Sequence, residues 1–170
     1  MKTAVFFFLV FVLQATSTIA QSAQYFSPLN AIPVGPNGVA TNKASVRPYC
    51  CPSTAIEITS NIPISNNDLQ WILIPLNGIL EGRISAVTVC YQILGKTTAS
   101  FISQVRLTEM SVPNSATVRL DDPSHLSSHA PTCYTSKTNN YTVTGTTTLE
   151  LRIALAPGEK ILIGGITILR

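Results

Sequence analysis

The chain has 170 residues, of which 45% are hydrophobic and 11% are charged, and its formal net charge is only +3. Its lysines and arginines are scattered singly, which argues against nucleic acid as a partner, because binding to a phosphate backbone needs them clustered. The length is sufficient for one domain with a substantial core. The low charge density fits a domain that works in an extracellular medium.

The N-terminus has the pattern of a secretory signal peptide. A short positive start, Met1 to Thr3, precedes an unbroken apolar run from Ala4 to Leu13, and the sequence Thr18-Ile19-Ala20 places small residues at a cleavage site. We expect residues 1–20 to be removed after Ala20, with cleavage after Ala23 as the alternative, and the protein to be secreted. The apolar run is shorter than the ~20 residues that span a bilayer, so no membrane span is expected after signal removal.

The segment from Gln21 to Pro52 is rich in Pro, Gly, Asn and Ser and has no helical periodicity. Its prolines exclude a long regular element. We interpret residues 21–52 as an extended arm and residues 53–170 as the folded domain.

The clearest strand is Thr147 to Leu155, in which Leu149, Leu151 and Ile153 alternate with polar residues at period two. A Pro-Gly turn follows, and Lys160 to Leu169 returns as a strand that is apolar on both faces, which indicates a central position. The Gly164-Gly165 pair within it predicts a bulge or a close approach by another backbone.

Turn signals every 10–15 residues separate further strands, as in a sandwich or barrel. Arg83 to Leu94 and Ser100 to Met110 are predicted to form a hairpin, and Trp71 is predicted to lie in the core. The remaining strands are expected at Ala55 to Ser60, Leu69 to Leu76, Ser115 to Leu120 and, as an eighth, Tyr141 to Thr144. The pattern predicts an all-β fold, an antiparallel two-sheet β-sandwich of about eight strands, jelly-roll-like.

The four cysteines, Cys50, Cys51, Cys90 and Cys133, predict two disulfides in an exported chain. A bond between adjacent cysteines closes a strained ring. We therefore favour one of the adjacent pair bonded to Cys90 and the other to Cys133. The alternative is Cys90 to Cys133, with Cys50 and Cys51 bonded together or to another chain.

Three polar features are candidate sites. Asn140-Tyr141-Thr142 is a glycosylation sequon if the source is a eukaryote. Tyr134 and Tyr141 flank a polar segment, expected to be a loop, and could stack on sugar rings, although both could instead close the edge of the core. His125 and His129 would share one face of a helical turn, with Asp121 or Asp122 adding an oxygen to a metal site, although a polar surface loop explains the same residues.

No sequence motif for nucleophilic catalysis occurs, and no cofactor is expected. Paired carboxylates for glycoside hydrolysis would have to come from acidic residues such as Glu57, Glu81, Glu109, Glu150 and Glu159. We therefore predict a secreted, non-enzymatic domain that binds an extracellular glycan or protein or contributes to a surface structure. The alternatives are a secreted carboxylate-dependent hydrolase and a self-assembling structural or matrix protein.

Overall fold

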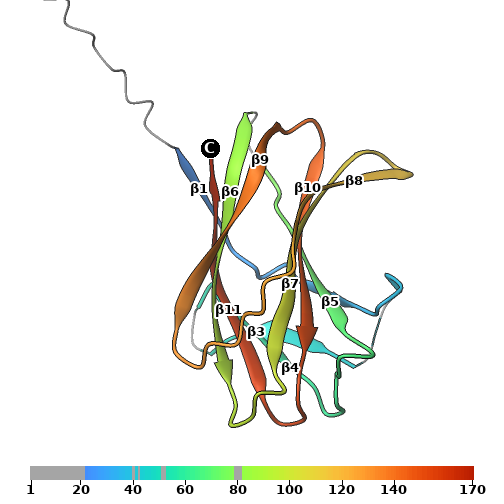
Figure 1. Ribbon diagram of the computed structural model, residues 1–170, viewed down its shortest axis with the longest axis vertical. Helices are drawn as coiled ribbons and strands as arrows, with labels where there is room; N and C mark the ends of the chain where they lie inside the picture. Colours follow the sequence, from blue (N-terminus) through green and yellow to red (C-terminus); the bar gives the residue numbers. More distant parts are fainter. Residues whose placement is uncertain (1–21, 40, 42, 51–52, 79–81) are drawn as a thin grey trace, which may run out of the picture.

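The computed structural model describes residues 22–39, 41, 43–50, 53–78 and 82–170 (Figure 1). Within them the chain forms two packed antiparallel sheets, and none of the described residues is helical. The strands are β1 (Ala23–Phe26), β2 (Ile32–Val34), β3 (Ser45–Pro48), β4 (Ile56–Thr59), β5 (Gln70–Pro75), β6 (Arg83–Leu94), β7 (Phe101–Val112), β8 (Ser115–Asp122), β9 (Thr132–Thr142), β10 (Thr146–Ala154) and β11 (Lys160–Leu169). The predicted all-β sandwich is confirmed, with eleven strands instead of about eight.

The six-stranded sheet has the order β3-β4-β11-β6-β9, with β1 also pairing with β11. The five-stranded sheet has the order β2-β5-β10-β7-β8. As expected from its apolar faces, β11 is central, and its register shifts between Ile163 and Ile166, where the two glycines form the predicted irregularity. The described residues include no helix long and apolar enough to cross a membrane.

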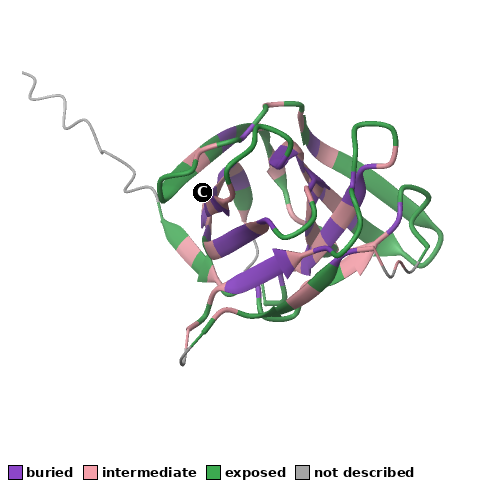
Figure 2. Ribbon diagram, turned by 90° about the horizontal axis from the view of Figure 1, so that it is seen from below, coloured by how far each residue is buried: buried purple, intermediate pink, exposed green. Residues whose placement is uncertain are grey.

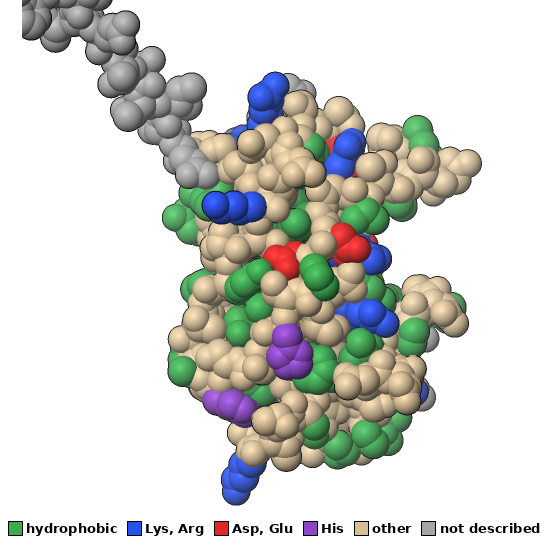
Figure 3. Space-filling view, in the orientation of Figure 1, with side chains coloured by type: hydrophobic (Ala, Val, Ile, Leu, Met, Phe, Trp, Pro, Cys, Tyr) green, Lys and Arg blue, Asp and Glu red, His purple; other side chains and the backbone are tan. Residues whose placement is uncertain are grey.

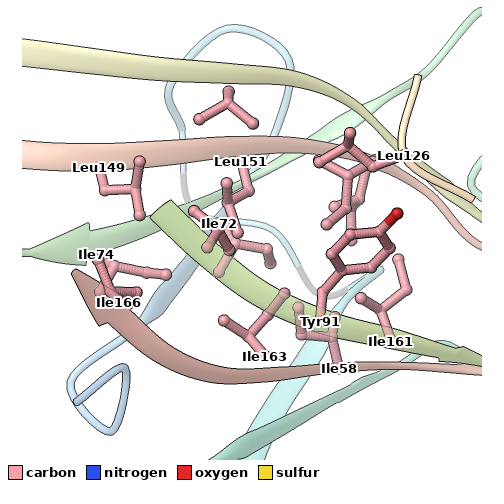
Figure 4. Close-up of a cluster of buried hydrophobic side chains, with 14 of the residues drawn as sticks. Ile58, Ile72, Ile74, Tyr91, Leu126, Leu149, Leu151, Ile161, Ile163 and Ile166 are labelled. Atoms are coloured by element: carbon pink, nitrogen blue, oxygen red, sulfur yellow. The ribbon is translucent and has the colours of Figure 1, made fainter. Parts of the chain in front are cut away.

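Aliphatic side chains from the inner faces of both sheets fill the space between them. Figure 4 shows Ile72, Leu149 and Leu151 of the five-stranded sheet facing Ile163 and Ile166 of the six-stranded sheet. All five are fully buried, and Figure 2 shows the buried residues along the strands while most loop residues are exposed. Burying such side chains contributes about 1.5–3 kcal/mol each, which makes this core the main source of stability.

The segment expected to be an extended arm supplies three short strands. β1 pairs with β11, β2 with β5 and β3 with β4, so residues of this segment extend both sheets. The prolines limit the length of these strands, but edge positions tolerate them.

The predicted hairpin between β6 and β7 is wrong, because the two strands belong to different sheets. Glu159 holds the connection between them. Its carboxylate accepts hydrogen bonds from the backbone of Lys96 at 2.8 Å and of Thr97 at 2.9 Å, and from the Ser100 hydroxyl at 2.5 Å. A side chain at Gly95 would overlap this carboxylate.

The loop expected between Tyr134 and Tyr141 is also wrong. Residues 132–142 form β9, an edge strand that pairs with β6, and the predicted eighth strand at Tyr141 is only the end of it. The polar composition concealed this strand. The inward-facing Ser136 is buried, and its hydroxyl donates a hydrogen bond to Asp122.

Trp71 was predicted to lie in the core and does not. Along β5, Gln70, Ile72 and Ile74 are fully buried, whereas Trp71 and Leu73 point outward and are half-buried. Side chains alternate between the two faces of a strand, so this register puts the indole on the outer face of the five-stranded sheet.

Candidate functional site

The outer face of the five-stranded sheet brings one aromatic ring together with planar polar side chains. Strand register puts Arg152 of β10 opposite Trp71 on one side and Gln104 of β7 on the other. One row along, Glu150 lies opposite Arg106, which in turn lies opposite Asp121 of β8. We call this group the Trp71 face, made up of Trp71, Gln104, Arg106, Asp121, Glu150 and Arg152.

Two guanidinium groups lie against the indole. The Cζ atom of Arg106 is 4.7 Å from the centroid of the Trp71 ring, and that of Arg152 is 5.7 Å away. Both distances lie within the range of cation–π attraction. The contacts fix the orientation of the indole relative to the strands on which the arginines lie.

Asp121 holds Arg106 in place. Its carboxylate accepts hydrogen bonds from Arg106 Nε at 3.0 Å and Nη2 at 3.4 Å, and a third from the Gln104 amide. Arg152 and Glu150 have no ion-pair partner among the residues that the structure describes. Two positive and two negative groups therefore leave the Trp71 face with no net charge and with unused hydrogen-bonding groups.

Tyr134, a predicted ligand-binding residue, points into the edge of the sandwich instead of into solvent. Its hydroxyl donates to Asp122 Oδ2 at 2.8 Å and lies 2.6 Å from the Ser124 hydroxyl, and Ser136 also donates to Asp122. These contacts join β8 and β9, the edge strands of the two sheets. Burial alone would raise the pKa of Asp122, but hydrogen bonds from Ser136, Ser124 and Tyr134 outweigh it and lower that pKa.

Tyr141, the second predicted ligand-binding residue, belongs to a different polar group. The Cζ atom of Arg119 lies 5.1 Å from its ring centroid, and Arg119 Nε lies 2.7 Å from the buried Glu109 carboxylate. Burial raises the pKa of Tyr141 to about 12. Both tyrosines pack partly against the core, as the alternative prediction stated, and their polar partners differ: Asp122 for Tyr134 and Arg119 for Tyr141.

The structure does not bring the candidate metal ligands together. Asp121 is hydrogen-bonded to Arg106, and Asp122 is hydrogen-bonded to Tyr134. The His125 ring packs against Phe101, with 4.2 Å between the ring centroids. The segment after β8 is not helical, so the four-residue spacing does not align His125 with His129. The two histidines appear as separate groups in Figure 3, and no three His, Cys, Asp or Glu side chains of the described part could hold a metal.

The acidic residues considered for hydrolysis are mostly held by structural partners. Glu57 is buried between Arg47 and Lys160, with Lys160 Nζ at 3.1 Å, while Glu109 and Glu159 accept several hydrogen bonds each. Burial raises the pKa of each of these three carboxyls, but their hydrogen bonds and ion pairs outweigh it and lower the pKa. A general acid needs the opposite shift. Glu81 lies outside the described residues.

The favoured disulfide pairing is wrong and the alternative is confirmed for one bond. Cys90 is bonded to Cys133, with Cα atoms 3.9 Å apart, because β6 and β9 are neighbours and place the two residues directly opposite each other. Cys50 is also disulfide-bonded, while Cys51 lies outside the described residues, as does the predicted signal peptide.

Asn140, the candidate glycosylation site, is exposed and has a φ of 51° near the end of β9. Asparagine tolerates this left-handed conformation better than most residues. Glycosylation stays a prediction.

A scan against family models and a search of curated proteins find no match to this chain. Among solved structures, it is similar to the CBM22-1–GH10 modules of Clostridium thermocellum endo-1,4-β-D-xylanase 10B complexed with xylohexaose, with a TM-score of 0.50 and 8% identity over 85% of this chain and 27% of that one. It is also similar to CBM29_1, a family 29 carbohydrate-binding module from Piromyces equi, with a TM-score of 0.45 and 11% identity over 87% and 91% of the two chains. At 8% identity, the likeness to the xylanase modules concerns the fold alone, in keeping with the two packed sheets described above.

Proposed function

We propose that this chain is a secreted, non-catalytic domain that binds a glycan through the Trp71 face. The observation that carries the proposal is the outward position of Trp71, with Arg106 and Arg152 over its ring, among planar polar side chains of the neighbouring strands. The sandwich fold is compatible with this function, but the argument rests on the residues of the face, since a fold hosts many functions.

The chemistry of a sugar suits such a surface. A pyranose has an apolar ring face and a rim of hydroxyl groups. The exposed part of the half-buried indole offers apolar contact to the ring face, while carboxylate, amide and guanidinium groups exchange hydrogen bonds with the hydroxyl groups. Because the two arginines are balanced by Asp121 and Glu150, the face favours a neutral saccharide.

Secretion is supported by the predicted signal peptide and by the Cys90–Cys133 disulfide, since such bonds persist in oxidising compartments. The lowered pKa values of Glu57, Glu109 and Glu159 support a non-catalytic role, because these groups are committed to structural contacts.

The test is a glycan array probed with the full chain, expressed with its own leader and recovered from the medium. We expect binding to neutral oligosaccharides, with at least tenfold weaker binding by Trp71→Ala, because the indole is the only aromatic group of the face. Tyr25→Ala is the matched control, since Tyr25 is 77% exposed on the other sheet. Chelation of metals should have no effect. The proposal fails if no glycan binds or if both variants bind alike.

Self-association is a second candidate function, favoured by the β7–β8 hairpin. Met110, Val112 and Val118 are 45%, 49% and 50% exposed there. Residues 110–118 include no charged side chain, and β8 is an edge strand, so a second copy could pack or pair against it. Analytical ultracentrifugation should then show an average mass that rises with protein concentration, and Val118→Lys should abolish this rise. A protein that stays monomeric at millimolar concentration would exclude this function.

A further inference from the structure

The outer face of the six-stranded sheet contains a pocket that the Trp71 face does not involve. It has a volume of about 420 Å³, within the range of small-molecule sites. Its lining includes the disulfide-bonded Cys90 and Cys133, together with Leu162, Gly164 and Tyr49. Leu162 points outward from the sheet between the inward-facing Ile161 and Ile163, yet it is only 9% exposed.

The lining of the pocket is uncharged. No Lys, Arg, Asp, Glu or His is among the residues that form it, and most of its surface comes from carbon and sulfur atoms. Its lining includes the amide of Gln92, whose Nε2 donates to the His129 carbonyl at 2.9 Å and so leaves Oε1 as an acceptor. An ionised ligand would lose hydration there without gaining a partner.

Gly164 gives the pocket its depth. It lies at the β11 irregularity beside Cys90, where a Cβ would come no closer than 3.6 Å to any neighbour. The backbone thus accepts a side chain at this position, and the absence of one leaves the disulfide open to a ligand. Sulfur atoms and the Tyr49 ring both make favourable contacts with aromatic rings.

We propose that this pocket binds an uncharged small molecule that carries a flat aromatic ring. The ring lies over the disulfide and Leu162, against Tyr49, and a donor group on the ligand reaches Gln92 Oε1. This site is independent of the proposed glycan-binding face, because its residues all belong to the other sheet or to the segments next to it.

The test uses two fluorescent probes that share one ring system. N-phenyl-1-naphthylamine is uncharged, and 8-anilino-1-naphthalenesulfonate adds a sulfonate. Titrated into the full secreted protein, the uncharged probe should saturate at one site per chain and bind at least tenfold more tightly than the sulfonate. No saturable enhancement, or equal affinity for the two probes, would overturn the proposal.

Two variant pairs locate the site. Gly164→Leu fills the pocket and should weaken the uncharged probe at least tenfold, whereas Gly165→Leu, next to it but not among the lining residues, should not. If Gly164→Leu fails to fold, Gln92→Lys places a charge in the pocket, with Thr88→Lys on the same face of β6 as control. Equal binding by a variant and its control would overturn the proposal. Glycan binding should survive in all four, which separates this site from the Trp71 face.

Discussion

Glu109 accepts hydrogen bonds from several groups at one end of the sandwich. Its carboxylate is 1% exposed and accepts hydrogen bonds from Arg119 at 2.7 Å, from the Thr144 hydroxyl at 3.0 Å and from the Gly145 backbone at 2.6 Å. These partners come from β8 and from the turn between β9 and β10. One carboxylate therefore joins elements of both sheets.

We predict that Glu109→Gln lowers the free energy of unfolding by about 2–4 kcal/mol, because an amide cannot accept all of these bonds and leaves the arginine without its partner. Urea denaturation measures the change. Glu150→Gln is the control, since Glu150 is half-buried on the Trp71 face without an ion-pair partner in the described part, and we expect less than about 0.5 kcal/mol. Equal effects would contradict this role of Glu109.

The orientation of Trp71 shows why the site could not be predicted from residues alone. The run from Leu69 to Leu76 is apolar on both faces, and a shift of one residue exchanges them. The polarity of the side chains does not decide which face is buried, because, of the neighbours Gln70 and Trp71, it is the polar Gln70 that is buried. In the same way, Tyr134 and Asp122 are polar residues whose partners come from another part of the chain, and no local pattern reveals them.

At the scale of elements, the turn between β9 and β10 depends on Gly145. A Cβ there would overlap the backbone carbonyl of Met110 in β7, so the close approach of the turn to β7 requires glycine. The same approach lets Gly145 donate to Glu109.

We predict that Gly145→Ala destabilises the domain by about 1–3 kcal/mol, because backbone must move to admit the methyl group. The melting temperature should fall by several degrees, given about 2–4 °C per kcal/mol for a domain of this size. Gly165→Ala, where nothing lies within 4 Å of the added atom, should melt within about 1 °C of the parent chain. A harmless Gly145→Ala would contradict the close approach.

The limits of strands with an apolar inner face could be predicted closely from the sequence. Which strands lie beside them in the sheet could not. β6 and β11 have the predicted limits because their alternation or continuous apolarity is unambiguous. The edge strand β9 was missed because its residues are mostly polar. The hairpin expected at Gly95 was wrong because β6 and β7 belong to different sheets, and Glu159, distant in sequence, holds the connection between them. The favoured disulfide pairing was wrong because β9, which carries Cys133, was not predicted to lie beside β6. The pairing of cysteines depends on which strands are adjacent.

For the whole molecule, the buried carboxylates determine how stability depends on pH. The pKa values of Glu57, Glu109, Asp122 and Glu159 are all lowered in the folded state, because hydrogen bonds and ion pairs outweigh their burial. As pH falls, the unfolded chain takes up protons first, which favours unfolding.

We therefore predict that the free energy of unfolding is highest near neutral pH and falls as pH drops from about 4.5 through the lowered pKa values. Urea denaturation at pH 7, 4 and 3 measures it, and Asp122→Asn should weaken the dependence. Unchanged stability between pH 7 and pH 3 would contradict these pKa directions.

The two outer faces of the sandwich differ in chemistry. The five-stranded sheet presents an indole among planar hydrogen-bonding groups, whereas the six-stranded sheet presents an uncharged pocket over a disulfide. We propose glycan binding for the first of these faces.

The most direct test is calorimetric titration of the best array glycan into the parent chain, Trp71→Ala and Tyr25→Ala. We predict saturable binding at one site by the parent and by Tyr25→Ala, and at least tenfold weaker binding by Trp71→Ala with its melting curve still cooperative. Full affinity in a folded Trp71→Ala variant would contradict the claim.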